Sequence, residues 1–427
     1  MVKMEIISKV SIKPSSPTPN NLRTFRLSLL DQLFPPSFRV PLVLYYSHDE
    51  SASHVKQAEI SSVLKRSLSD ALSLYYPFAG RMKDESSVDC SDQGVDYLEA
   101  RVDTRLSEII EQPKVEVINQ FIPSTGEGVL LGIQLNYFSC GGIAIGVSIC
   151  HTVTDGCTLS MFLKAWAAMA RGDTNMVAPS FVMPSLFPPR EAFGLQTSLK
   201  SSKPSSQTRR FCFSSSKIAA LRAEVAASTG VQPTRVQLVT ALIWKWAMAR
   251  KGRDRGLPSF VWCPVNVRGR MDPPLSEYTF GNGIWRENIS GNGEMDLGEL
   301  VSKTREGVGK IDSKYLKELQ GANVNDRPVR DCKKMMESFV NNEVDYFLIT
   351  SWCRFSFYEL DFGWGKPVWV STASWGCSNM VVLIDSVSDI GGIEAWITMD
   401  EVDRAVVEPG FGHGGDIIPT LTYHARL

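Results

Sequence analysis

Hydrophobic and polar positions alternate along several short segments of the chain. The runs "LGIQLNYF", "PVWVST" and "MVVLIDSV" show this alternation, which is typical of strands with one buried face. Three longer segments instead carry apolar residues at helical spacing: "EISSVLKRSLSDALSLYYP", "SKIAALRAEVAAS" and "TRVQLVTALIWKWAMAR". Together with hairpin signals, these elements predict an α/β fold with mixed rather than purely parallel sheets.

A polar segment near the middle of the chain separates two parts of ordinary domain size. The stretch "SLKSSKPSSQTRR", residues 198–210, is rich in Ser, Lys and Pro and has almost no apolar residues. We expect it to be a crossover linker between an N-terminal domain of residues 1–197 and a C-terminal domain of residues 211–427. A chain of 427 residues is too long for one compact core.

One β-hairpin is predicted over residues 131–150, with its reversal at Cys140, Gly141 and Gly142. Its second strand carries an apolar stripe on one face and delivers His151 at its end. The opposite face has only small residues, so we expect a bulky group or another backbone to pack closely there. These small residues are Ala144, Gly146, Ser148 and Cys150.

Asp155 follows His151 by four residues, just before Gly156 and a helical pattern in "CTLSMFLKAWAAMARG". The carboxylate can therefore cap that helix by accepting from free backbone N–H groups. Taken alone, the pair needs no catalytic explanation. Neighbouring strand residues point to opposite faces, so Cys150 cannot form a nucleophile pair with His151, and a cysteine acyl-enzyme is disfavoured.

Composition excludes several kinds of partner. Basic and acidic residues nearly cancel, 45 against 46, which gives no reason to expect a nucleic-acid surface. The N-terminus lacks a signal-peptide pattern, and no run approaches the ~18 apolar residues of a membrane span. The nine cysteines show no CxxC spacing, which indicates reduced thiols. We therefore expect a cytoplasmic protein with no membrane association.

Absent motifs exclude other enzyme classes. The chain has no HExxH, no GxSxG and no clustered His/Cys ligands, so neither a zinc hydrolase nor an α/β-hydrolase is expected, and no metal site is predicted. The segment "GFGHGG" fits GxGxxG by letter. It lies too near the end of the chain to open a βαβ unit.

Two motifs in this order resemble the paired signature of the plant BAHD acyltransferases, which transfer acyl groups from coenzyme A thioesters. They are "HTVTDG" at residues 151–156 and "DFGWGKP" at residues 361–367. The stretches "SLLDQLFPP", "YYPFAGRM" and "PVNVRGRMDPP" also resemble members. The similarity extends to about Glu401 and is closest to the branch of vinorine synthase and related alkaloid acetyltransferases. From about residue 402, the Gly- and Pro-rich tail departs from it.

The resemblance implies a two-domain fold like that of chloramphenicol acetyltransferase, with a tunnel between the domains and His151 inside it. It implies a monomer with no bound cofactor, and acyl-CoA, most simply acetyl-CoA, as cosubstrate with a small-molecule acceptor. The expected reaction is direct acetylation of a hydroxyl on an alkaloid or terpenoid, with His151 as general base. Two alternatives are N-acylation of an amine and a non-catalytic relative that only binds a small molecule.

The resemblance also assigns roles to other residues. It implies that Asp155 pairs with an arginine at the position of Arg268, and that the carboxylate thereby has a structural role. The alternative is a triad role that orients His151. Asp361 is expected to have a structural role in the wall near the coenzyme.

The stretch "PTRVQ" at residues 233–237 predicts a capping box, in which Thr234 and Gln237 exchange hydrogen bonds at a helix start. In the alternative interpretation, this helix N-terminus and Arg235 also bind the coenzyme phosphates.

Overall fold

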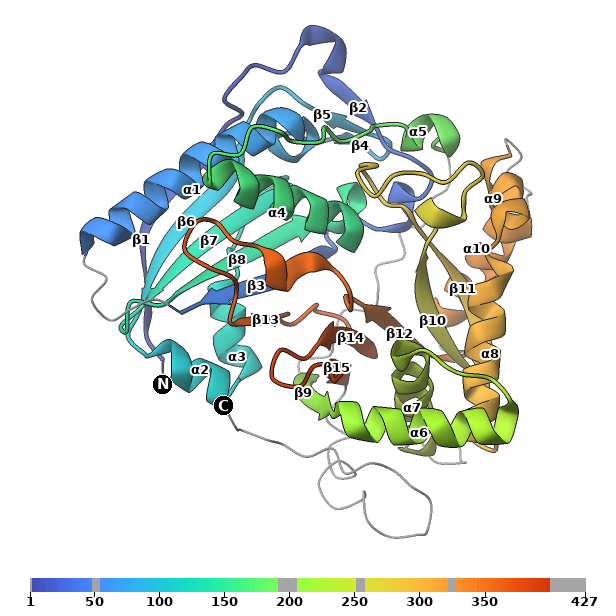
Figure 1. The fold of residues 1–427 in the computed structure, drawn as a ribbon. Helices are drawn as coiled ribbons and strands as arrows, with labels where there is room; N and C mark the ends of the chain where they lie inside the picture. The colour runs from blue at the N-terminus through green and yellow to red at the C-terminus, as the bar shows by residue number, and fades with distance from the viewer. Residues whose placement is uncertain are drawn as a thin grey trace. The chain divides into compact units, whose positions relative to one another are not determined.

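A computed structural model describes residues 2–47, 54–190, 206–250, 258–321, 327–341 and 343–399 (Figure 1). The chain forms two compact units. The first comprises Met1–Gln196, Leu275–Gly283 and Phe355–Trp375, and the second comprises Thr197–Pro274, Ile284–Arg354 and Gly376–Leu427. Each unit contains a six-stranded sheet with both parallel and antiparallel pairs, which confirms the predicted α/β fold with mixed sheets.

The units differ from the predicted domains in two segments, because Leu275–Gly283 and Phe355–Trp375 both belong to the first unit. Phe355–Trp375, which carries the DFGWG motif, belongs to the first unit and not to a C-terminal domain. The cause is β13 (Trp369–Ser371), which pairs with β3 (Arg39–Tyr46) of the first sheet. Of the predicted linker, residues 198–205 lie outside the described residues and Gln207–Arg210 begins β9 (Gln207–Phe213). The Gly- and Pro-rich tail also lies outside them.

The first unit is built on a sheet of order β1-β6-β7-β8-β3-β13. The predicted hairpin is confirmed as β7 (Leu131–Phe138) and β8 (Ile143–Cys150), which pair antiparallel. Helices α1 (His54–Leu74) and α4 (Gly156–Ala170) lie on the same face of this sheet (Figure 1). The remaining strands and α-helices of this unit are β1 (Met4–Ile12), β2 (Thr24–Arg26), β4 (Arg81–Asp84), β5 (Ser87–Asp89), β6 (Val95–Val102), α2 (Leu106–Glu111), α3 (Val115–Ile118) and α5 (Met183–Leu186).

The second unit has a sheet of order β11-β10-β12-β14-β15-β9. Its apolar core lies between this sheet and helices α6 (Ser215–Thr229), α7 (Arg235–Arg250) and α8 (Leu297–Lys310), and α6 and α7 match the two helices predicted after the linker. None of the helices in the described ranges is both long and apolar enough to span a membrane. The remaining elements are β10 (Ser259–Asn266), β11 (Ile284–Gly291), β12 (Asp345–Ser351), β14 (Met380–Asp385), β15 (Ile393–Met399), α9 (Ser313–Gln320) and α10 (Arg327–Val340).

The small-residue face of β8 meets another backbone, as the sequence predicts. A Cβ atom added to Gly146 would lie 1.8 Å from the carbonyl oxygen of Phe121, at the end of the 3₁₀ turn η4 (Asn119–Phe121). Real Cβ atoms do not come this close to an oxygen. Glycine is therefore required here by the space available, because the backbone conformation of β8 is that of an ordinary strand.

We expect Gly146→Ala to destabilise the first unit strongly, because the methyl group can be accommodated only if η4 moves away from the sheet. Overpacking of this kind costs roughly 1–3 kcal/mol or more. Gly309→Ala in α8, where an added Cβ would have nothing within 4 Å, is the control and should be neutral or slightly stabilising. Thermal melts of both variants and the wild type measure the difference. Equal melting temperatures would contradict the close approach.

Candidate active site

His151 lies directly after β8, where the chain enters the 3₁₀ turn η5 (His151–Val153). Its backbone N–H donates to the carbonyl of Phe38 at 2.8 Å, which fixes the chain at the strand end. The imidazole stacks on the ring of Phe34, with centroids 3.8 Å apart and planes at 14°. Phe38 and Trp375 complete an aromatic surround, with ring centroids at 5.5 Å and 6.5 Å from the imidazole.

The two ring nitrogens of His151 have different surroundings. The residue is 9% exposed, and Nδ1 is a buried atom with no hydrogen-bond partner in the structure. Nε2 is not a buried, unpartnered atom of this kind. Of the two ring nitrogens, Nδ1 is therefore the one enclosed by the protein.

Burial lowers the pKa of His151 to about 4, because an imidazolium loses hydration in this apolar setting. The backbone carbonyl of His151, the charge of Asp155 and the side chain of Asn282 oppose that shift. The imidazole is therefore neutral near neutral pH. In this form it can accept a proton.

Asp155 caps α4, as predicted from the sequence. Its Oδ1 accepts from the Thr158 backbone N–H and its Oδ2 from the Gly283 backbone N–H, both at 2.8 Å, and the residue is 1% exposed. The carboxylate thus joins the helix start to the segment that enters β11. Arg268 is 2% exposed in the 3₁₀ turn η7 of the second unit, and its pairing with Asp155 stays a prediction.

Asp31 and Asn282 were not identified from the sequence, although Asp31 lies in the quoted "SLLDQLFPP". Oδ1 of Asp31 accepts from the backbone N–H of Asn282 at 2.7 Å and from its Nδ2 at 2.9 Å. Nδ2 of Asn282 also donates to the carbonyl of His151 at 2.8 Å. All three residues are buried in the first unit. The glycines on each side of Asn282 are a turn signal, but they do not indicate the contact with His151.

Asp361 closes the DFGWG loop with its own side chain. Oδ1 accepts from the backbone N–H groups of Gly363 at 2.7 Å and Gly365 at 2.9 Å. These donors lower the pKa of the carboxyl below its usual value. Both glycines have positive φ, 110° and 104°, which suits glycine. Arg171, just after α4, donates to the backbone carbonyl of Asp361.

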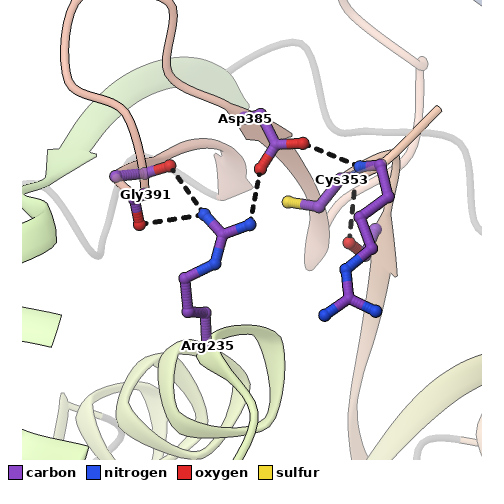
Figure 2. Close-up of polar contacts among 7 residues, drawn as sticks. Arg235, Cys353, Asp385 and Gly391 are labelled. Carbon is purple, nitrogen blue, oxygen red and sulfur yellow. Dashed lines mark hydrogen bonds and ion pairs between the residues drawn. The ribbon is translucent and has the colours of Figure 1, made fainter. Parts of the chain in front are cut away.

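Thr234 and Gln237 form the predicted capping box at the start of α7. The Thr234 N–H donates to Oε1 of Gln237 at 2.9 Å, and the Gln237 N–H donates to Oγ1 of Thr234 at 3.1 Å. The guanidinium of Arg235 pairs with Asp385 at 3.0 Å and donates to the carbonyl of Gly391 at 2.9 Å (Figure 2). Arg235 thus joins α7 to the β14–β15 connection, and its contact with coenzyme phosphate stays a prediction.

Comparisons with known proteins agree on the class of protein. A model of the Transferase family matches residues 2–411. The chain is 36% identical to stemmadenine O-acetyltransferase of Catharanthus roseus and to limonoid 1-O-acetyltransferase of Citrus sinensis, each match covering 96% of this chain and 97% of the relative.

Solved structures show the same fold. The crystal structure of vinorine synthase matches with a TM-score of 0.81 and 34% identity, covering 94% of this chain and 96% of that one. TRI101 of F. graminearum, crystallised with coenzyme A and deoxynivalenol, matches with a TM-score of 0.66 at 16% identity, over 90% of this chain and 97% of that one. The match to TRI101, at this low identity, is evidence for the fold alone.

The protein is therefore an acyltransferase with the two-unit fold that the sequence resemblance implied. The chain belongs to the Transferase family, that of the plant BAHD acyltransferases, and its relatives are acetyltransferases of alkaloids and limonoids.

We expect Asp155→Ala to lower the free energy of unfolding by roughly 2–4 kcal/mol, because it removes a helix cap and leaves the buried N–H of Gly283 unpaired. Asp296→Ala is a matched control. Asp296 caps α8 through the Glu299 N–H at 2.8 Å but is exposed, so its loss should cost less. Chemical denaturation and turnover per folded molecule are measured together. An Asp155→Ala protein of normal stability that has lost turnover would support the triad role instead.

Proposed function

We propose that the chain transfers an acetyl group from acetyl-CoA to a hydroxyl of an alkaloid or terpenoid acceptor, with His151 as general base. The observation that carries this proposal is the neutral imidazole at the end of β8, with Nδ1 buried and Nε2 left for a reactant. The named activities of the relatives, stemmadenine and limonoid O-acetylation, support acetyl as the acyl group and oxygen as the acceptor atom.

In the proposed reaction, Nε2 of His151 removes the proton of the acceptor hydroxyl as its oxygen attacks the thioester carbonyl. The carbonyl carbon becomes tetrahedral, and the C–S bond breaks when the intermediate collapses. The departing thiolate takes the proton back from the imidazolium, so that the ester and free coenzyme A thiol leave and His151 is again neutral. No covalent acyl-enzyme is formed.

The two thiols near His151 in sequence fit this direct transfer. Sγ of Cys150 donates to the carbonyl of Pro36 at 3.3 Å, and burial raises the pKa of its thiol. Sγ of Cys157 lies 3.5 Å from the carbonyl of Glu277, to which it donates. The Cys150 thiol is therefore held in its protonated, weakly nucleophilic form.

We further propose that the enzyme acts as a monomer in the cytosol, as the family resemblance implies. All nine cysteines are free thiols, which is typical of proteins in a reducing compartment. Incubation with acetyl-CoA and a panel of hydroxylated alkaloids and terpenoids, with release of free thiol as the signal, tests the function directly. Matched amine acceptors distinguish O-acylation from N-acylation.

His151→Ala should fold and bind acetyl-CoA, while turnover falls by the ~10²–10⁴-fold that is typical of a lost general base. The double variant Cys150→Ala/Cys157→Ala should keep most of its activity, because neither thiol takes part. Steady-state kinetics and coenzyme binding by calorimetry measure these effects. Mass spectrometry of enzyme with acetyl-CoA alone is the control: an acetyl adduct that forms and decays at the turnover rate would overturn direct transfer.

The acid limb of the pH profile should lie well below the usual range of histidine. Because the pKa of His151 is about 4, kcat/KM should change little from about pH 7 to about pH 5 and then fall as the imidazole takes up a proton.

The same pKa shift affects the stability of the fold. Folding is therefore followed by circular dichroism at each pH of the activity profile. The folded state resists protonation, whereas the unfolded histidine titrates near 6.5. The contribution of His151 to stability is therefore complete above pH 6.5 and is lost as the pH falls towards 4. If kcat/KM instead falls between pH 7 and pH 6 while the enzyme is fully folded, the base has the pKa of a solvated histidine, and the prediction is wrong.

A further inference from the structure

Two buried polar atoms, on residues that contact each other, lack hydrogen-bond partners: Nδ1 of His151 and Oδ1 of Asn282. The two residues are already joined, because Nδ2 of Asn282 donates to the backbone carbonyl of His151 at 2.8 Å. One orphan atom can carry a proton and the other can only accept one. Buried polar atoms without partners are rare, so this complementary pair needs an explanation.

The orientation of the Asn282 amide is set by Asp31. Oδ2 of Asp31 accepts from both the N–H and the hydroxyl of Ser28 at 2.7 Å, and Oδ1 accepts from the N–H and Nδ2 of Asn282. All four partners are donors, which suits an ionised carboxylate, since a protonated one would need an acceptor. If the amide were reversed, Oδ1 of Asn282 would face this carboxylate and the His151 carbonyl, and both contacts would be repulsive.

The backbone of Asn282 is held from both sides by carboxylates. Asp31 accepts from its N–H at 2.7 Å, and Asp155 accepts from the N–H of the next residue, Gly283, at 2.8 Å. Before it, Gly281 has a φ of 98°, and an added Cβ would lie 3.3 Å from Oδ1 of Asp31. The side chain of Asn282 therefore has little freedom to turn away from His151.

We propose that Asn282, oriented by Asp31, is the positioning residue that holds His151 in its Nδ1–H tautomer and so leaves the lone pair of Nε2 free to act as base. This inference rests on the proposed role of His151. Oδ1 of Asn282 accepts the Nδ1 proton in the working enzyme, where hydrogen bonds of catalytic groups become shorter and better aligned than in the free state.

Two further observations support this assignment over one to Asp155. Both oxygens of Asp155 already accept from backbone N–H groups, those of Thr158 and Gly283. The side chain of Asn282 also favours the charged form of His151 and so raises its pKa against the effect of burial. An acceptor at Nδ1 has this effect, because it binds an imidazolium proton more strongly than a neutral one.

Nitrogen-15 NMR of histidine-labelled protein tests the tautomer directly, and the chain has only five histidines. The His151 signals are assigned as those that disappear in His151→Ala. Wild-type His151 should show a protonated Nδ1 and an unprotonated Nε2. Asn282→Leu should shift the population towards Nε2–H and lower kcat roughly tenfold or more, with little change in the KM for acetyl-CoA.

Asn136→Leu is the matched control for loss of a buried amide. Asn136 is also 0% exposed in the first unit, and its Nδ2 donates to the carbonyls of Phe121, Gln134 and Ala144. This variant should lose stability but keep the wild-type tautomer and kcat per folded molecule. If Asn282→Leu fails to fold, Asn282→Ala retains the backbone bond to Asp31 and is used in its place.

The inference is overturned if wild-type His151 carries its proton on Nε2, or if a folded Asn282 variant retains both the tautomer and kcat of the wild type. These outcomes are distinct from failure of the proposed function. If the proposed function fails, His151→Ala itself retains full turnover, whatever the tautomer of His151 in the wild type.

Discussion

The carboxylate of Asp31 joins two segments that are 251 residues apart in the sequence, and the geometry around His151 depends on it. It is completely buried and accepts four hydrogen bonds from Ser28 and Asn282. Burial raises its pKa, and the four donors oppose that effect. A buried carboxylate with fewer donors would be costly to the fold. The four donors offset the cost of burying the Asp31 carboxylate. They also make the contact between the N-terminal segment and Leu275–Gly283 specific.

Burial at His151 has two opposite consequences for its proposed role as general base. The aromatic surround removes water and lowers the pKa of the imidazole, so that nearly every molecule holds the basic form near neutral pH. The same shift makes the imidazole a weaker proton acceptor, because a general base works best when its pKa is near the operating pH. Groups that stabilise the imidazolium recover part of this loss. The backbone carbonyl of His151, Asp155 and Asn282 are those groups here.

The sequence was most informative where the structure depends on near neighbours. The strands of the hairpin, the Asp155 cap and the Thr234–Gln237 capping box are set by alternation or by contacts three residues apart, and the structure reproduces them. The close approach at Gly146 was also predictable, because only small residues occupied that face of β8.

Contacts between segments far apart in the sequence could not be predicted from such local patterns. No local pattern relates Asp31 to Asn282, and none shows that β13 pairs with β3, the pairing that groups the DFGWG loop with the first sheet. The tautomer of His151 depends on the same kind of contact. It follows from an amide whose orientation is fixed by a carboxylate that lies far away in the sequence.

The aspartates of the two motifs make the same kind of contact. Asp155 accepts from the N–H groups of Thr158 and Gly283, and Asp361 accepts from those of Gly363 and Gly365. In each case a carboxylate satisfies backbone donors where the chain turns or a helix begins, as Asp side chains commonly do. Within HTVTDG and DFGWG, the side chain suited to proton transfer is then that of His151. The motifs are recognisable by their aspartates and glycines chiefly because these residues build the loops. In the proposed reaction, the chemistry depends on how accurately those loops place one imidazole.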